Sequence, residues 1–157
     1  MQRASYLKQA KVKAAAYCAK GEKAPYQVMQ KLLGWELEEE EAQQVLAELI
    51  HENFVNEERF VRAYCRDKFR FNQWGKHRIR LELNRLKISD QVLEEGLSSI
   101  DPEAYEATML KLASKKWQSV KGDAWPRKQK TIAYLVQKGF EMDLSREVVE
   151  QLSSSEQ

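Results

Sequence analysis

Four arginines in the segment 57–71 repeat at the spacing of one helix face. Arg59, Arg62, Arg66 and Arg70 fall within an arc of about 80° when each residue advances by 100° around a helix. A guanidinium group presents a planar fork of N–H donors that can bind a carboxylate or a phosphate through two hydrogen bonds. Such a row predicts contact with nucleic acid or with an acidic protein partner. The competing interpretation is a solvated helix face balanced by acidic residues elsewhere.

The cationic pattern continues past this segment, across an expected turn and into a second helix. The complete set of candidate binding residues, called the basic surface below, is Arg59, Arg62, Arg66, Arg70, Trp74, Lys76, Arg78 and Arg80. The ring of Trp74 could stack on a nucleobase. A tryptophan at a helix junction also commonly fills a packing gap, and the sequence leaves both interpretations open.

The opposite side of the arginine-bearing segment is apolar. Phe60, Val61, Tyr64 and Phe71 lie broadly opposite the arginines, so we expect the helix to bury them. Lys68 falls on the same side and must extend its ammonium group to solvent along its apolar stem. The segment therefore predicts an amphipathic helix with a cationic outer face.

The charges are strongly segregated along the chain, although the net charge is only +2. Residues 59–88 carry ten basic and two acidic side chains. The preceding stretch, 36–58, carries nine glutamates and no lysine or arginine. A basic block of this density inside ordered sequence favours a surface for a polyanion or an acidic partner.

The residue types needed for catalysis or metal binding do not cluster in the sequence. His51 and His77 are single, and Cys18 and Cys65 lie 47 positions apart, so neither pair has metal-ligand spacing. The glutamate run 38–41 points in several directions on a helix, which favours a solvated first turn over an acid/base pair. No glycine-rich phosphate loop occurs. We expect no catalytic residues, no metal and no cofactor, and a protein that is not an enzyme.

The elements that position these side chains repeat with a period of about 50 residues. Leu32–Leu37, Leu83–Ile88 and Leu135–Phe140 each join two apolar residues five positions apart, and the steps between copies are 51 and 52 residues. Such a period indicates stacked supersecondary units. A further apolar residue follows nine positions after the end of each pair, at Leu46, Leu97 and Val149. The prediction is one all-α domain over 1–157, with three three-helix repeats at about 5–53, 54–100 and 101–153.

Capping and breaking residues place several helix boundaries. Gly21 is expected to end the first helix, and Pro25 to open the second. Asn56 is expected to cap the arginine-bearing helix, and Asp101 with Pro102 to begin the seventh.

The last boundaries follow from three further signals. The segment 121–123 is expected to form a loop, and Pro126 to precede a helix that ends at Gly139. The tail 153–157 is expected to fray.

Composition bounds the class of protein. Charged residues make up 32% of the chain, and six glycines and three prolines are too few for many short strands. Two cysteines suggest no disulfide framework, which favours a reducing cytoplasm. No window approaches a membrane span.

Four stretches resemble the RecX family of bacterial regulators of the RecA recombinase. They are 24–35 (APYQVMQKLLGW), 54–66 (FVNEERFVRAYCR), 75–88 (GKHRIRLELNRLKI) and 128–140 (KQKTIAYLVQKGF). The departures from the family pattern are Asn56 for a usual aspartate, Val61 for a common alanine, and Leu86-Lys87 for a Lys-Gly pair. The last departure puts in doubt only how that helix ends.

The resemblance implies a non-enzymatic modulator whose three repeats form an elongated, curved body. Such a protein is expected to bind RecA filaments on DNA and to restrain ATP hydrolysis, strand exchange and co-protease activity. Single- or double-stranded DNA is an expected partner through or beside RecA, and we expect a monomer with no membrane contact. The alternative is a stand-alone helical DNA-binding protein that uses the basic second repeat. The near-neutral total charge argues against this alternative.

Overall fold

The computed structural model describes residues 2–156, which form nine α-helices and no strand. The helices are α1 (Gln2–Ala19), α2 (Pro25–Gly34), α3 (Glu39–His51), α4 (Glu57–Asn72), α5 (Lys76–Arg85), α6 (Asp90–Ser98), α7 (Pro102–Ser119), α8 (Ala124–Gln137) and α9 (Met142–Ser155). The all-α prediction is confirmed. None of the helices in this part of the chain is long and apolar enough to cross a membrane.

The helices form two compact units. Unit 1 contains the chain up to Tyr64 together with Leu83–Glu94, and unit 2 contains Cys65–Glu82 together with the chain from Glu95 onward. Each of α4, α5 and α6 therefore contributes residues to both units. The units do not follow the predicted repeat boundaries, which stay a prediction.

The repeated Leu-x4-apolar signature marks the C-terminus of the second helix in each repeat. The residue before the second apolar position has left-handed backbone in all three copies, with φ of 64° at Glu36, 58° at Lys87 and 103° at Gly139. Each of these residues also donates its amide N–H to the carbonyl oxygen three positions earlier, at 3.1, 3.1 and 2.9 Å respectively. The three helix ends thus share this left-handed turn, although only one of them has glycine at the left-handed position.

In the second and third copies, a second backbone hydrogen bond joins the two apolar residues of the signature. The amide of Ile88 donates to the carbonyl of Leu83 over 3.3 Å, and the amide of Phe140 donates to that of Leu135 over 3.0 Å. Together the two bonds define the Schellman motif, in which the residues at both ends also make a hydrophobic contact. All four side chains are buried. The spacing of five that recurs in the sequence is therefore the spacing that this helix cap requires.

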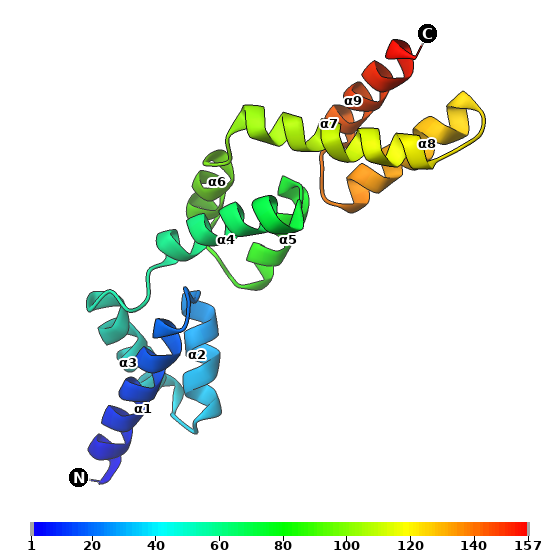
Figure 1. The fold of residues 1–157 in the computed structure, drawn as a ribbon. Helices are drawn as coiled ribbons and strands as arrows, with labels where there is room; N and C mark the ends of the chain where they lie inside the picture. Colours follow the sequence, from blue (N-terminus) through cyan, green and yellow to red (C-terminus); the bar gives the residue numbers. More distant parts are fainter. Residues whose placement is uncertain (1, 157) are drawn as a thin grey trace. The chain divides into compact units, whose positions relative to one another are not determined.

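In unit 1, α1, α2 and α3 pack on one another around a small apolar core (Figure 1). The buried members are Ala10, Ala14, Cys18, Val28, Leu32, Leu37, Ala42, Val45, Leu49 and Val55. Leu46 is only partly buried, unlike Leu97 and Val149 at the matching positions. At the open end of this bundle the Arg3 side chain donates two hydrogen bonds to Glu41, which lower the pKa of that carboxyl to about 2.

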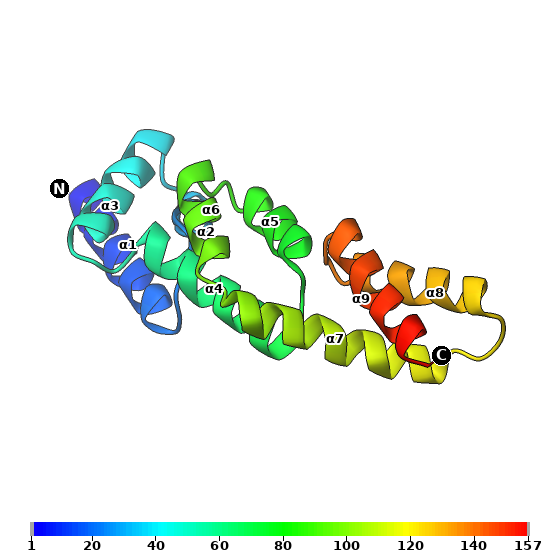
Figure 2. The ribbon, with the colours of Figure 1, turned by 90° about the horizontal axis from the view of Figure 1, so that it is seen from above.

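In unit 2, α7, α8 and α9 pack on one another (Figure 2). Tyr105 of α7 is the centre of an aromatic cluster, with ring centroids 5.6 Å from Phe69 and 5.2 Å from Phe140. Met109 of α7 and Leu135 of α8 are also fully buried in this unit. This core holds the end of α4 and the start of α5 as well, because residues 65–82 belong to unit 2.

Two of the capping predictions are confirmed in atomic detail. The side chain of Asn56 accepts a hydrogen bond from the amide of Arg59 at 2.9 Å, and Asp101 accepts one from the amide of Ala104 at 3.0 Å. These contacts satisfy N-terminal amides of α4 and α7 that lack a partner inside the helix.

Two boundaries near the C-terminus differ from the prediction. α8 begins at Ala124, so Pro126 is its third residue and does not precede it. A proline is tolerated there because first-turn amides have no partner within the helix. α9 continues to Ser155, so 153–155 do not fray, and Gln157 lies outside the described residues.

The end of α9 is held by Glu156. Its carboxylate accepts hydrogen bonds from the indole nitrogen of Trp117 at 2.7 Å and from the guanidinium of Arg127 at 3.0 Å. Arg127 also donates to the carbonyl oxygen of Trp117 at 3.0 Å, and its guanidinium lies 3.9 Å from the centre of that ring. These contacts with α7 and α8 thus hold the last turn of α9. They could not be predicted from the sequence near residue 156, because both partners lie far away along the chain.

Candidate anion-binding surface

The arginines of α4 divide into one that is engaged and three that are exposed. Arg59 donates to Glu22 over 2.7 Å and to the carbonyl oxygen of Asn53 over 3.0 Å. These contacts fasten the start of α4 to unit 1 and occupy the guanidinium. Arg62, Arg66 and Arg70 are exposed.

The three exposed guanidinium groups are open to a ligand. Arg62 has no ion pair or hydrogen bond within residues 2–156. Arg66 contacts only the neighbouring Asp67, at 3.1 Å, with 65% of its side chain exposed. Arg70 lies over the ring of Phe71, 5.7 Å from its centre. An adjacent-residue pair of this kind contributes little to stability and can be displaced at small cost.

The apolar side of α4 agrees with the prediction at three positions and differs at a fourth. Phe60 and Val61 are buried and Tyr64 is half-buried, its ring centroid 5.6 Å from that of Phe60. The prediction for Phe71 is wrong, because its side chain is 72% exposed. Phe71 lies in the last turn of α4, where Phe69 makes the contact with the aromatic cluster instead.

Trp74 lies in the turn between α4 and α5, between two cations. Its ring centre is 4.3 Å from the guanidinium carbon of Arg78 and 5.1 Å from the ammonium nitrogen of Lys68. The Lys68 side chain, which starts on the apolar side of α4, thus places its ammonium group against the Trp74 ring. Because the ring is half-buried and already contacts two cations of the chain, Trp74 is a less open stacking platform than a fully exposed tryptophan.

The basic residues of α5 differ in their exposure to solvent and in the contacts that their side chains make. Arg78 is exposed, and its only described contact is with Trp74. Lys76 is half-buried, with its ammonium nitrogen 5.0 Å from the centre of the Tyr105 ring. Arg80 is half-buried and lies 3.4 Å from the imidazole of His77. Arg62, Arg66, Arg70 and Arg78 are therefore the members of the basic surface with the most accessible guanidinium groups.

The N-terminus of α5 is anchored by the C-terminus of α8, inside unit 2. The amide of Gly75 donates to the carbonyl of Lys138 at 2.9 Å, and the amide of His77 donates to that of Gly139 at 3.0 Å. The ammonium group of Lys138 donates in turn to the carbonyl oxygen of Asn72 at 3.2 Å. Amides that lack partners at one helix start thus meet carbonyls that lack partners at another helix end.

This anchor requires glycine on both sides. A Cβ atom on Gly75 would lie 2.2 Å from the carbonyl carbon of Gly139, and a Cβ on Gly139 would lie 2.4 Å from the Cβ of Arg78. The anchor therefore fixes the helix turn that carries Arg78. The glycines of the GK and KGF motifs were visible in the sequence, but their mutual contact was not.

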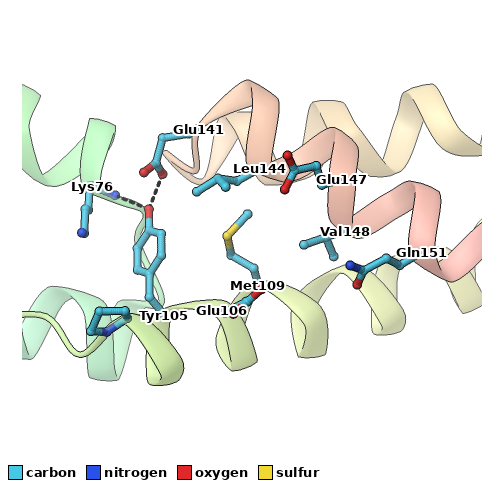
Figure 3. Close-up of a pocket in the computed structure, with 10 residues that line it drawn as sticks. Lys76, Tyr105, Glu106, Met109, Glu141, Leu144, Glu147, Val148 and Gln151 are labelled. Atoms are coloured by element: carbon cyan, nitrogen blue, oxygen red, sulfur yellow. Dashed lines mark hydrogen bonds between the residues drawn. The ribbon is translucent and has the colours of Figure 1, made fainter.

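Tyr105 completes the anchor from α7 (Figure 3). Its hydroxyl oxygen accepts a hydrogen bond from the amide of Lys76 at 2.9 Å, and its O–H donates to the carboxylate of Glu141 at 2.5 Å. Burial, followed by the hydrogen bond to Glu141, raises the pKa of this phenol above its ordinary value. Both hydrogen-bonding capacities of the neutral hydroxyl are in use, so Tyr105 acts as a structural link.

A pocket of about 270 Å³ lies beside this link, between α7 and α9 (Figure 3). Met109, Leu144 and Val148 give it apolar walls, and the carboxylates of Glu106 and Glu147 lie at its rim. None of these groups forms a nucleophile–base pair, and within the described part of the chain no three His, Cys, Asp or Glu residues could hold a metal ion. The exposed arginines are therefore the better candidate site.

Two domain models of known proteins match the chain. The second three-helix domain of RecX matches residues 56–97, and the third three-helix domain of RecX matches residues 103–149. Together they cover more than half of the sequence.

The chain belongs to the RecX family.

Relatives from several bacteria carry the name regulatory protein RecX. The one from Clostridium perfringens (strain 13 / Type A) is 30% identical over 122 residues, which is 76% of this chain and 57% of that protein. The one from Prosthecochloris aestuarii is 30% identical over 114 residues, which is 73% of this chain and 74% of that protein. The chain thus spans little more than half of the length of the Clostridium relative.

Solved RecX structures share the fold. The crystal structure of RecX from Lactobacillus salivarius superimposes with a TM-score of 0.87 at 21% identity, covering 95% of this chain and 97% of that one. All eight residues of the basic surface lie within the match to the second RecX domain, whereas Tyr105, Gly139 and Glu141 lie within the third.

Sequence reasoning missed the groups that hold the surface in place. Glu22 lies 37 positions before Arg59, and Tyr105 lies 29 positions after Lys76. No local pattern marks either residue as a partner.

Proposed function

We propose that this protein regulates the recombinase RecA by binding RecA–DNA filaments, and that it mainly inhibits their ATPase, recombinase and co-protease activities. The observation that carries the proposal is the row of accessible guanidinium groups of Arg62, Arg66, Arg70 and Arg78 within the part of the chain that matches the second RecX domain. Membership of a family whose curated members are named regulatory proteins supports a regulatory role.

The chemistry of this surface suits binding rather than catalysis. A filament on DNA exposes phosphates and carboxylates, and each guanidinium can bind either one through two N–H donors. Regulation then follows from occupancy of the filament, with no cofactor and no catalytic residue required. The same arginines could reach DNA beside RecA, and a single copy of the chain carries the whole set.

The test is the ATPase rate of RecA on single-stranded DNA as this protein is titrated in. We expect the wild type to slow hydrolysis, and Arg62→Glu with Arg66→Glu to weaken inhibition by at least tenfold, equivalent to about 1.4 kcal/mol of binding free energy. Lys8→Glu with Lys20→Glu is the matched control, because it makes the same charge change on exposed lysines of unit 1. Circular dichroism of each variant checks that the helices are intact.

Two results of this assay would contradict the proposal. An unchanged ATPase rate with wild-type protein would contradict RecA regulation itself. Equal inhibition by the arginine variant and by the wild type would leave regulation intact but would place the contact elsewhere on the chain.

A second candidate function is binding to DNA without RecA. The excess of ten basic over two acidic side chains in residues 59–88 favours it. Duplex binding by the protein alone should then fall steeply with salt, with a slope of log affinity against log salt of about −0.9 per phosphate contact. Absence of measurable duplex binding at low salt would exclude this candidate.

A further inference from the structure

A second basic segment, outside the basic surface, lies in the third repeat. Residues 110–130 carry seven basic side chains and one acidic side chain, Asp123. They cover the second half of α7, the loop to α8 and the first two turns of α8. The residues on either side of this segment are predominantly acidic, so the charge of this region is concentrated where two helices meet at a loop.

Trp125 lies in this segment and is exposed. It is the second residue of α8, and its side chain is 71% accessible to solvent. Trp117, by contrast, is 4% exposed, and Trp35 and Trp74 are half-buried. Trp125 makes no ring, cation or hydrogen-bond contact within the described residues. An indole that the fold leaves open is available as a contact for another molecule.

Several lysines around Trp125 are free of internal partners. Lys121 precedes it in the loop, and Lys130 follows it five residues later, about 7–8 Å along the axis of α8 and about 140° around it. A strand that contacts both Trp125 and Lys130 therefore has to pass around the start of α8. Both are exposed, and neither forms an ion pair within residues 2–156. Other cations of the segment are engaged, as in the pair of Lys128 with Glu150 at 3.2 Å.

One acidic side chain stands against the seven basic side chains of the segment, so an excess of positive charge remains at the helix start. Asp123 is the N-cap residue of α8, yet its side chain caps no amide of the first turn. The positive end of the helix dipole therefore adds to the field of Lys121.

We propose that the loop between α7 and α8 binds single-stranded nucleic acid, with a base stacked on Trp125 and backbone phosphates at Lys121 and Lys130. An aromatic platform next to cations is the combination that single-strand binders use. A duplex keeps its base faces stacked, so the exposed indole selects an unpaired base. An acidic protein partner could also bury this ring, and the test below separates the two occupants by titrating RecA without DNA.

This inference is tested with the protein alone, so it does not depend on RecA. The protein is labelled with 5-fluorotryptophan, and the four ¹⁹F signals are assigned by single Trp→Phe substitutions. The probe is an oligothymidylate of about 15 nucleotides, near the upper end of known single-strand site sizes. The signal of Trp125 is expected to shift on titration, and Trp125→Ala to weaken binding roughly five- to 150-fold.

The lysines are tested through the salt dependence of the same binding. Lys121→Gln with Lys130→Gln is expected to reduce the slope of log affinity against log salt by about 1.4, which corresponds to about 0.7 for each lost phosphate contact. Lys8→Gln with Lys20→Gln is the matched control and should leave the slope unchanged.

Three outcomes would overturn the inference. The first is an unmoved Trp125 signal together with unchanged affinity of Trp125→Ala. The second is a shift confined to Trp74, which would place the nucleic acid on the basic surface. The third is a Trp125 signal that responds to RecA without DNA but not to oligothymidylate, which would make this loop a protein contact. A failure of the ATPase assay alone would count against RecA regulation and not against this site.

Discussion

Replacing Gly75 with alanine should break the anchor between α8 and α5. The added Cβ would lie 2.2 Å from the carbonyl carbon of Gly139 and 2.3 Å from the amide nitrogen of Phe140. Non-bonded carbon atoms need about 3.5 Å or more, so the two backbones must separate by about 1.3 Å. The hydrogen bonds from Gly75 and His77, now 2.9 and 3.0 Å, would then lengthen to about 4.2–4.3 Å, which is too long for a hydrogen bond.

The magnitude follows from these two bonds. Each contributes about 1 kcal/mol net, and a buried amide or carbonyl left without a partner costs about 1–3 kcal/mol more. With both bonds lost and one group left buried without a partner, we therefore expect Gly75→Ala to lower the free energy of unfolding by about 3–5 kcal/mol. The substitution should also loosen the start of α5, which carries Arg78, and so weaken RecA inhibition.

Urea unfolding followed by circular dichroism measures the loss, and hydrogen exchange of the His77 amide measures it locally. Gly34→Ala is the control, because a Cβ there meets nothing within 4 Å and alanine favours the helix by up to about 1 kcal/mol. If Gly75→Ala and Gly34→Ala unfold at the same urea concentration, the close approach of the two glycines has no energetic importance and the reasoning fails.

Three further predictions concern other sites. Lys87→Gly should raise the free energy of unfolding by about 1 kcal/mol in urea, because φ is 58° at this position and glycine adopts it without strain. Tyr105→Phe should lower it by about 1–3 kcal/mol in the same assay, since the amide of Lys76 and the carboxylate of Glu141 both lose their partner while the ring packing remains. Burial raises the pKa of the Cys65 thiol to about 11, so iodoacetamide should not label it in the folded protein at pH 7. The free energy of unfolding should fall as the pH rises past the ordinary thiol pKa towards 11, because only the unfolded chain then loses the proton. Rapid labelling at pH 7 would contradict this burial.

The sequence predicts the helices well because the information for them is local. The recurring Leu-x4-apolar signature reflects one helix cap, whose two hydrogen bonds and hydrophobic contact span only six residues. Leu86-Lys87 left the end of the helix before Ile88 in doubt, and the structure gives it the same ending as the helix before Phe140, with Lys87 in place of glycine. The departure from the family pattern at Lys87 therefore changes the cost of the turn and not its shape.

The candidate site was predicted less completely because its supports are distant in sequence. Helical spacing placed Arg59 with Arg62, but only the fold brings Glu22 to Arg59 and withdraws that guanidinium. Helical spacing also placed Phe71 on the apolar side, although its ring stays 72% exposed at the end of α4 and lies against Arg70. Periodicity identifies the face on which a side chain lies, and tertiary contacts decide whether anything covers that face.

The anchor between α8 and α5 also sets an order of events during synthesis. Lys138 and Gly139 emerge from the ribosome more than 60 residues after Gly75. At about 5–20 residues per second, the start of α5 waits roughly 3–13 s for its hydrogen-bond acceptors. Unit 1 can pack α1–α3 during this interval, whereas the second half of α4 and the start of α5 cannot. Of the arginines that carry the proposed function, Arg66, Arg70 and Arg78 are therefore positioned last, when the C-terminal helices have been made.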